Sequence, residues 1–294
     1  MKCGFVSIIG RANVGKSSLL NSILECHLAI TSPISGTTRI VIQGIYNDDD
    51  SQIIFLDTPG IHKAINKMGR YLNKHATGMY KDSDVILFVV DAYAGIGKGD
   101  RMIIDTLKSV DVPVILVLNK IDKLNNEQIF KAIDTYKDLY SFAEIVPVSA
   151  LENDNIERLI SVIKKYIPEN VKYFNDDEVT NLSKQFMISE YVREKLFKYL
   201  KQEVPHSITC VTASYEEREN ITNIGVDIIV DRDSLKKIVI GKDGSLLKTV
   251  GQESRKDIEE LLGKKVYLEL YVKTVDNWRE KERSLREFGI LDNE

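Results

Sequence analysis

The sequence has few cysteines and histidines and no strong excess of charge of either sign. Its three cysteines, Cys3, Cys26 and Cys210, lie far apart and form no Cys-x-x-Cys pair, and its four histidines are scattered. This distribution argues against a disulfide framework, a zinc knuckle or a histidine metal cluster, and it fits a reducing compartment. The formal net charge of −4 excludes a histone-like polycation, so any binding of nucleic acid must come from a local site.

Long hydrophobic runs are also missing. The longest uninterrupted apolar runs are 85–90 and 112–118, whereas a membrane-spanning helix needs about 20 apolar residues. The apolar stretch 5–9 is too short for a signal peptide and is typical of a strand. We therefore expect a cytoplasmic protein.

The chain has 294 residues, which is enough for about two domains. In its first part, short apolar runs alternate with helical stretches, a pattern that predicts a doubly wound, mostly parallel α/β sheet. In such sheets, ligands bind at the carboxyl ends of the strands. The predicted strands are 5–9, 53–56, 85–90, 114–118 and 145–148, and the predicted helices are 16–25, 66–81, 99–109, 126–140 and 153–166.

The pattern changes after Pro168. Residues 169–181 are polar and lack periodicity, which predicts a linker between a domain at 1–168 and a second domain at 182–294. The second domain has the predicted order α-β-β-α-α-β, with a Gly-x-x-Gly between its two middle helices. Its predicted elements are a helix at 188–200, strands at 207–215, 224–230 and 266–272, and a last helix of mixed charge at 276–287.

A phosphate-binding motif follows the first predicted strand. Residues 10–17 match G-x-x-x-x-G-K-[ST] and open a predicted helix, which is the context that this motif requires. The glycines let backbone N–H groups face phosphates, and the helix N-terminus adds positive potential. Lys16 would contact the β- and γ-phosphates, and the Ser17 hydroxyl would bind Mg²⁺.

Three later motifs narrow the ligand to a guanine nucleotide. The segment 57–60, Asp-Thr-Pro-Gly, would bind Mg²⁺ through water at Asp57 and reach the γ-phosphate through the last N–H. The segment 119–122, Asn-Lys-Ile-Asp, ends another strand. The carboxylate of Asp122 can accept the N1–H and the exocyclic amine of guanine, whereas adenine would leave it buried and unpaired. Residues 149–151 can place a backbone N–H at the guanine O6.

Two adjacent threonines compete for the remaining Mg²⁺ position. Either Thr37 or Thr38 could bind Mg²⁺ and respond to the presence of the γ-phosphate, and we favour Thr38. The candidate metal ligands are therefore Ser17, Thr38 and, through water, Asp57. The candidate nucleotide-binding residues are Gly10, Arg11, Ala12, Asn13, Val14, Gly15, Lys16, Ser17, Ser18, Thr38, Asp57, Thr58, Pro59, Gly60, Asn119, Lys120, Asp122, Ser149, Ala150 and Leu151.

These motifs resemble those of the translation-factor-related GTPases and, within them, the Era family. The five G motifs stand in the family's order, Glu190–Leu196 resembles its helix signature, and 241–244 with 268–273 resemble its KH domain. The resemblance implies a Ras-like P-loop GTPase domain followed by an α+β type II KH domain. It also implies binding to single-stranded RNA near the 3′ end of the small-subunit ribosomal RNA, and a role in assembly of the 30S-type subunit.

The position that orients the attacking water in Ras-type GTPases lacks its glutamine. Ile61 follows Gly60, and isoleucine cannot orient water, so we expect slow intrinsic hydrolysis and assign no catalytic residue. Asn13 stands where potassium-dependent relatives have an asparagine, which makes K⁺ a candidate cofactor beside Mg²⁺. An asparagine in a tight turn also has a purely structural explanation.

The Gly-x-x-Gly at 241–244 is a weak motif alone, but its place between two short helices is that of a KH domain. There, phosphates approach the backbone and a groove takes about four unpaired nucleotides. Basic residues cluster around the loop although the domain is nearly neutral, so we expect modest non-specific affinity. The candidate RNA-binding residues are Lys237, Ile238, Ile240, Gly241, Lys242, Asp243, Gly244 and Lys248.

The leading hypothesis is a monomeric, GTP-gated switch that binds RNA. The alternative is a membrane-associated signalling GTPase whose C-terminal unit is a tether or protein-partner module. The sequence has no lipidation motif, and its helix at 276–287 would give only a weak peripheral contact at the inner face of the cell membrane. A third hypothesis is a constitutive RNA-binding protein with a relic G domain, against which the intact Lys16, Asp57 and Asp122 argue.

Overall fold

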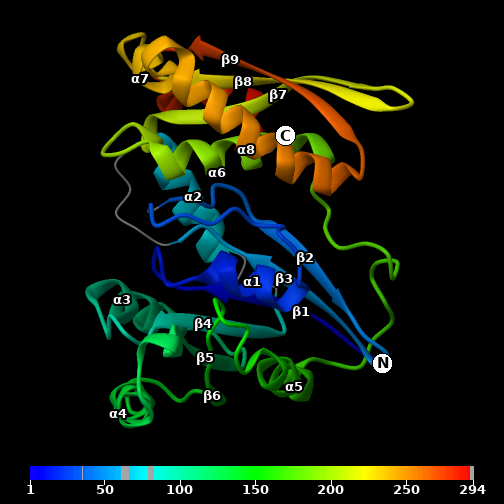
Figure 1. The fold of residues 1–294 in the computed structure, drawn as a ribbon. Helices are drawn as coiled ribbons and strands as arrows, with labels where there is room; N and C mark the ends of the chain where they lie inside the picture. The colour runs from blue at the N-terminus through cyan, green and yellow to red at the C-terminus, as the bar shows by residue number, and fades with distance from the viewer. Residues whose placement is uncertain (35, 61–65, 79–82, 292–294) are drawn as a thin grey trace. The chain divides into compact units, whose positions relative to one another are not determined.

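The structure is a computed structural model that describes residues 1–34, 36–60, 66–78 and 83–291, with only the backbone of 73–78 (Figure 1). The chain divides into two compact units, Met1–Ala64 with Gly69–Asn181, and Ile65–Met68 with Leu182–Glu294. Among the described residues, no helix is both long enough and apolar enough to cross a membrane.

The first unit contains a six-stranded sheet in the order β2-β3-β1-β4-β5-β6. Neighbouring strands are parallel except for β2 and β3, so the predicted α/β sheet is confirmed and one antiparallel edge strand is added to it. The strands are β1 (Lys2–Ile9), β2 (Ile42–Asn47), β3 (Ser51–Asp57), β4 (Val85–Asp91), β5 (Val114–Asn119) and β6 (Glu144–Pro147). The helices are α1 (Lys16–Leu24), α2 (Lys67–Gly78), α3 (Lys98–Leu107), α4 (Asn126–Lys137) and α5 (Ile156–Tyr166).

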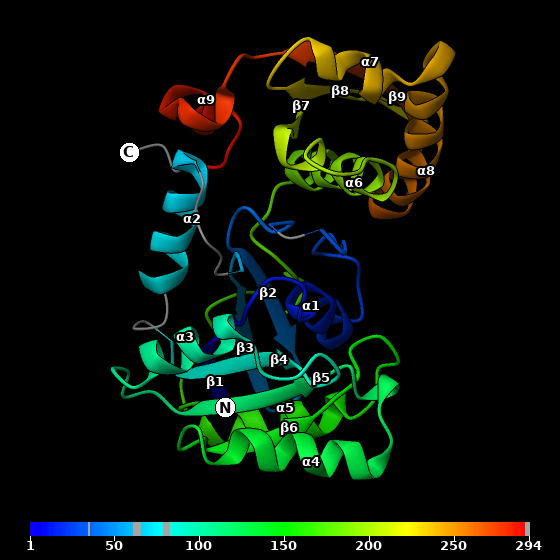
Figure 2. The same ribbon diagram turned by 90° about the vertical axis from the view of Figure 1, so that its left-hand side faces the viewer.

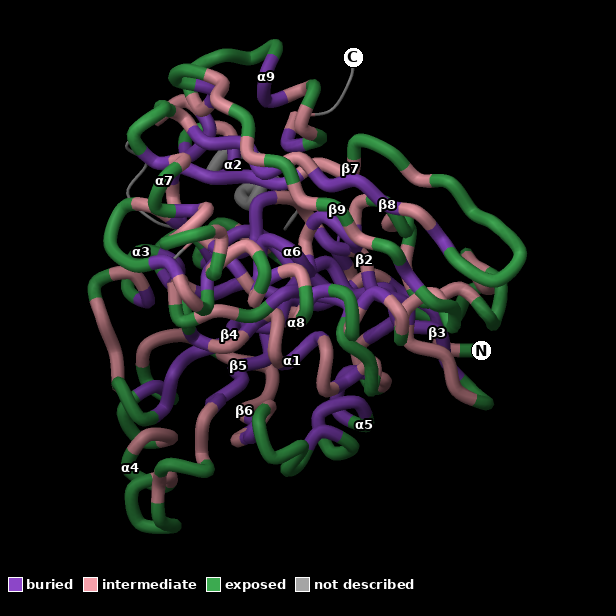
Figure 3. The backbone as a smooth tube through the Cα atoms, turned by 45° about the horizontal axis from the view of Figure 1, so that its top comes forward, coloured by how far each residue is buried: buried purple, intermediate pink, exposed green. Residues whose placement is uncertain are grey.

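The core of the first unit lies around β4 and β5, which are buried along their whole length (Figure 3). One face of these strands packs against α3 and α4 through side chains such as Ile103, Leu107 and Tyr136. The alternate residues of both strands are buried as well. Burial on both faces explains why these strands are continuous apolar runs in the sequence.

The strand register gathers the predicted motifs at one edge of the sheet. Ile8 is paired with Asp57, and Asp91 is paired with Asn119. The loop after β1 therefore lies beside the end of β3, and the end of β4 lies beside the end of β5. The carboxyl ends of these strands bring together segments that are far apart in the sequence.

The segment 169–181, predicted to be a linker, runs along the open edge of β2. The Ile45 N–H donates to the Val179 carbonyl (2.8 Å), and the Thr180 hydroxyl donates to the Gln43 carbonyl (2.6 Å). The Gln52 side-chain amide also donates to the Phe174 carbonyl (2.9 Å). These bonds satisfy backbone groups that an edge strand would otherwise leave unpaired.

The second unit has the predicted order α-β-β-α-α-β (Figure 2). Its strands β7 and β8 are antiparallel, and β8 and β9 are parallel. Helix α6 contacts β7 and α8, and α8 contacts β9, so the helices cover one face of the sheet. The elements are α6 (Lys184–Tyr199), β7 (Ile208–Glu217), β8 (Ile221–Val230), α7 (Ser234–Ile240), α8 (Ser245–Leu262) and β9 (Lys265–Thr274).

The C-terminal segment differs from the single helix predicted at 276–287. A 3₁₀ turn at Trp278–Glu280 and a short helix α9 at Glu282–Glu287 are separated by Lys281, whose backbone is extended. Trp278 is fully buried and donates its indole N–H to the Ser207 carbonyl (3.1 Å). Anchoring this side chain in the core interrupts the helical path.

Candidate nucleotide and nucleic-acid sites

The loop between β1 and α1 is shaped by its glycines. Gly15 has φ 96°, and a Cβ atom there would lie 2.3 Å from the Asn119 side-chain nitrogen. A Cβ atom at Gly10 would lie 2.3 Å from the Val89 carbonyl oxygen. Both positions therefore require glycine, because neighbouring atoms already fill the space.

The Lys16 side chain contacts the backbone of the loop between β1 and α1. Its ammonium donates to the carbonyls of Gly10 (3.2 Å) and Arg11 (3.1 Å). Burial lowers the pKa of Lys16, and the nearby Asp57 carboxylate partly opposes that shift. The ammonium is thus held where phosphates would meet the loop.

Three oxygen-bearing side chains converge beside Lys16. The Ser17 hydroxyl donates to Oδ2 of Asp57 (2.7 Å) and lies 3.0 Å from Oγ1 of Thr38. Oδ1 of Asp57 is buried and has no hydrogen-bond partner among the described residues. Burial raises the pKa of Asp57 to about 6, although Lys16 and Ser17 act in the opposite direction. A carboxylate with one unpartnered oxygen, next to the hydroxyls of Ser17 and Thr38, is a donor set that fits Mg²⁺.

The structure separates the two candidate threonines. The Thr37 hydroxyl donates to the Ile34 carbonyl (2.6 Å), whereas the Thr38 hydroxyl faces Ser17. Of the two side chains, it is Thr38 that lies at the oxygen cluster. Asn13, with φ 65°, donates its side-chain amide to the Pro33 carbonyl (2.6 Å) in the same connecting segment.

Asn119 ties together the loops that would surround a base. Its amide donates to the Val14 carbonyl (2.8 Å), and its Oδ1 accepts from the N–H groups of Lys120 (2.8 Å) and Ala150 (3.0 Å). The Ala150 N–H, which is one of the donors that the sequence offers for a guanine O6, is therefore directed at Asn119. The side chain of Leu151 is exposed.

Asp122 has one defined contact in this region. Its Oδ1 accepts the Ser149 hydroxyl (2.7 Å), and the Ser149 oxygen in turn accepts from the Glu152 N–H (3.2 Å). This chain of bonds orients the carboxylate with respect to the loop after β6. The predicted base-binding residues from two strand ends are thereby brought together.

The remaining predicted residues lie around the same loop. The Thr58 hydroxyl donates to the Ile8 carbonyl (2.9 Å), and a Cβ atom on Gly60 would lie 3.1 Å from the Ala12 backbone. A small cavity of about 60 Å³ is lined by Ser17, Ser18 and Thr38 among others. Ile61, predicted to replace the usual glutamine, lies outside the described residues.

Sequence analysis did not include two carboxylates that form ion pairs with predicted nucleotide-binding residues. Oδ2 of Asp91 lies 2.6 Å from the Lys120 ammonium. Buried Asp100 forms a 3.2 Å ion pair with Arg11, whose guanidinium also donates to the Gly95 carbonyl. The Arg11 side chain is thus held by contacts with Asp100 of α3 and with the Gly95 carbonyl just before this helix. The only signal for Asp91 in the sequence is that it ends an apolar strand, and Asp100 has none.

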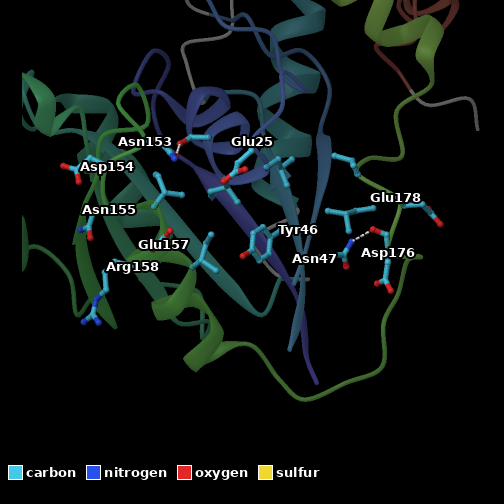
Figure 4. A pocket seen from close by; sticks show the side chains of 17 residues that line it. Glu25, Tyr46, Asn47, Asn153, Asp154, Asn155, Glu157, Arg158, Asp176 and Glu178 are labelled. Carbon is cyan, nitrogen blue, oxygen red and sulfur yellow. Dashed lines mark hydrogen bonds between the residues drawn. The ribbon is translucent and has the colours of Figure 1, made fainter. Parts of the chain in front are cut away.

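A larger groove in the first unit, of about 760 Å³, lies elsewhere (Figure 4). It is bordered by the end of α1, by β2, by the start of α5 and by residues 176–179. It contains none of the predicted nucleotide residues and is lined by several carboxylates. The candidate nucleotide site is therefore defined by the chemical groups that converge there, and not by the volume of the cavity.

The Gly-x-x-Gly loop of the second unit has three residues in the left-handed region. Gly241 has φ 77°, Asp243 φ 51° and Gly244 φ 75°. A Cβ atom on Gly241 would lie 2.8 Å from Leu246, but one on Gly244 would have no heavy atom within 4 Å. The first glycine is required by packing, whereas the second leaves open space that a phosphate could occupy.

A groove of about 290 Å³ lies between α8 and β9. Of the predicted RNA-binding residues, Lys248 lines it, while Lys237, Ile238, Ile240 and Lys242 do not. Ile238 is half exposed. The groove residues not found by sequence analysis are Leu247, Gly251, Gln252, Arg255, Leu268 and Leu270. The alternation of Leu268 and Leu270 in β9 was the available signal.

Known proteins match both units. The family model described as 50S ribosome-binding GTPase matches residues 5–120, and the KH domain model matches residues 203–279. A solved structure of an Era variant from Aquifex aeolicus, bound to GDP and AlF4⁻, is 40% identical over 99% of this chain and 100% of its own, with a TM-score of 0.96. This chain belongs to the Era family.

A second Era structure matches equally well. It is a complex of Era with MgGDPNP and nucleotides 1506–1542 of 16S ribosomal RNA, and it is 40% identical over 99% of this chain and 100% of its own, with a TM-score of 0.96. The Era match confirms the fold class predicted from the sequence, a P-loop GTPase domain followed by a KH domain.

Proposed function

We propose that this chain is a Mg²⁺-dependent GTPase that binds single-stranded RNA near the 3′ end of the small-subunit ribosomal RNA and acts in assembly of the small ribosomal subunit. The observation that carries the proposal is the cluster of Ser17, Thr38 and Asp57 beside Lys16. Support also comes from Era structures that hold GDP with AlF4⁻, or MgGDPNP with 16S ribosomal RNA.

The nucleotide-binding roles follow from the geometry. The N–H groups of residues 10–18 would hold the phosphates, and Lys16 would exchange its two carbonyl partners for phosphate oxygens. Ser17 and Thr38 would ligate Mg²⁺ directly, and Asp57 would do so through water. When bound, Mg²⁺ neutralises charge on the β- and γ-phosphates. Thr38 and the Gly60 N–H would respond to the γ-phosphate.

The base would be recognised at the ends of β5 and β6. Asp122 accepts two donors of guanine, the Lys120 stem lies along the ring, and residues 149–151 offer backbone N–H groups. The Gly-x-x-Gly loop with Lys237, Lys242 and Lys248 would hold RNA phosphates. The groove between α8 and β9 would take the unpaired bases.

In this proposal, the chain consists of a GTP-binding domain at 1–168, a linker at 169–181 and an RNA-binding domain at 182–294. The protein acts as a monomer in the cytoplasm. The membrane-tether alternative is not carried further, since residues 203–279 match a KH domain.

The proposal is tested by GTP turnover with and without an RNA oligonucleotide that has the 3′-terminal small-subunit sequence. We expect slow basal turnover that this RNA raises several-fold and a scrambled RNA does not. The variant Gly244→Asp should keep the basal rate and lose the response. Binding of RNA without any change in turnover would contradict the coupling of the two sites, and an absence of RNA binding would contradict the assignment of the KH domain.

Potassium is a separate prediction. The side-chain amide N–H of Asn13 donates to the Pro33 carbonyl. The side-chain oxygen of Asn13 is therefore the atom that could coordinate a monovalent cation beside the phosphates. We expect GTP turnover in KCl to exceed that in NaCl by about tenfold, because added charge at the phosphates stabilises the transition state. Equal rates in the two salts would exclude the role.

A further inference from the structure

Lys120 is held at both ends. Its backbone has φ 68° at the start of a 3₁₀ turn, Ile121–Lys123, so the residue leaves β5 in a fixed direction. Its ammonium lies 2.6 Å from Oδ2 of Asp91 and 2.7 Å from the Asn13 carbonyl oxygen. The stem between these points therefore spans from the end of β5 to the loop between β1 and α1.

Asp91 is itself well placed to hold this ammonium. It is the last residue of β4, and the register pairs it with Asn119, next to Lys120 in the chain. Its other oxygen accepts the Ala94 N–H (2.9 Å), which fixes the carboxylate plane. Burial alone would raise the pKa of Asp91, but hydrogen bonds from Lys120 and Ala94 and the charges of Lys120 and Arg11 lower it overall.

This ion pair differs from the surface pairs of the same unit. The side chains of Lys120 and Asp91 are 26% and 13% exposed, whereas those of Lys108 and Asp105 on α3 are 62% and 70% exposed. Exposed pairs contribute little because solvent screens them and their side chains stay mobile. The pair of Asp91 and Lys120 is sheltered and shares its ammonium with a carbonyl of the phosphate-binding loop.

We propose that Asp91 is a positioning residue of the guanine-nucleotide site, which holds the Lys120 ammonium against the Asn13 carbonyl and so fixes the lysine stem along the face of the base. The inference rests on the proposed function, since it concerns the same site. An unanchored lysine samples many rotamers, and ordering it when a nucleotide binds costs conformational entropy. Asp91 orders it beforehand, and the same contact ties β4 to the phosphate-binding loop.

The test is a double-mutant cycle on the dissociation rate of a fluorescent GDP analogue. Asp91→Asn keeps an oxygen for the Ala94 N–H and removes the charge facing Lys120. Lys120→Met keeps an apolar stem and removes the ammonium. We expect Asp91→Asn to raise the dissociation rate about tenfold in the presence of Lys120 and to have almost no effect when combined with Lys120→Met, since interacting residues are not additive.

Asp105→Asn, which neutralises the exposed carboxylate on α3, is the matched control and should leave the rate unchanged. Urea unfolding without nucleotide checks that each variant is folded. If Asp91→Asn does not fold, Asp91→Glu replaces it in the same cycle, since the longer stem also displaces the ammonium.

Equal effects of the Asp91 substitution with and without Lys120→Met would overturn the inference, as would an unchanged dissociation rate in the single variant. If the unsubstituted protein binds no guanine nucleotide in this assay, the proposed function fails. If it binds and the coupling is zero, only the role of Asp91 fails.

Discussion

Replacing Asp122 with asparagine is expected to weaken GTP binding at least about 100-fold and to create affinity for xanthine nucleotides. The carboxylate accepts both the N1–H and the exocyclic amine of guanine, whereas the asparagine amide would direct a donor at that amine. The asparagine oxygen can still accept the N1–H, but one charge-assisted hydrogen bond is lost, the other becomes neutral, and two donors face each other, which together costs about 3 kcal/mol. Xanthine has a carbonyl in place of the amine, so the asparagine amide can donate to it.

The measurement is the Kd of fluorescent GDP and XDP analogues for both proteins. The Ser149 hydroxyl, which donates to Asp122 in the native protein, can also donate to the asparagine oxygen, so the fold should be preserved. Asp134→Asn, which removes a carboxylate from an exposed pair with Lys137, is the control and should leave both affinities unchanged. Native affinity for GDP in the Asp122→Asn variant would refute the assignment of the base site.

Replacing Gly244 with aspartate is expected to lower the affinity for RNA about 100-fold while leaving GTP binding intact. A Cβ atom at this position meets no heavy atom within 4 Å, so the side chain has room to fold into place. The new carboxylate would stand where phosphates approach the loop and would repel them. Strain from φ 75° is moderate, because aspartate tolerates the left-handed region better than most residues.

Gly263 provides a matched control for this substitution. It has φ 63°, no heavy atom within 4 Å of a Cβ atom, and a place at the C-terminal cap of α8. Gly263→Asp therefore imposes the same strain and the same charge at the opposite end of α8 from the Gly-x-x-Gly loop. Gel-shift or anisotropy titrations should show loss of RNA binding in Gly244→Asp alone. A similar loss in both variants would point to damage of the domain as a whole.

That the predicted nucleotide motifs lie together could be predicted from the sequence because they stand at strand ends. Parallel strands place their carboxyl ends at one edge, so the motif containing Lys16, the one containing Asp57 and the one containing Asn119 had to meet there. The sequence favoured Thr38 over Thr37 as the candidate Mg²⁺ ligand but left both open. The difference arises from the turn at Ile34, whose carbonyl takes the Thr37 hydroxyl.

Strand β2 shows why part of the fold was not predicted. Its sequence, Ile-Gln-Gly-Ile-Tyr-Asn, has no clear alternation and contains Gly44, which weakens a strand assignment. The glycine is required by packing, since a Cβ atom would lie 2.6 Å from Leu24 and 2.8 Å from Leu20 of α1. This contact joins segments about 20 residues apart, so no local pattern reports it. The ion pair of Asp91 with Lys120 was hidden for the same reason.

The segment 169–181 also protects the first unit from association through its sheet. An uncovered edge strand is a template on which a strand from another molecule can pair, and natural proteins block such edges. Here the backbone of Ile45 is already bonded to Val179, and the Gln43 carbonyl accepts Thr180. A separate GTP-binding domain that ended at residue 168 would expose β2 and invite aggregation, whereas one that ended at residue 181 would carry its own edge cover.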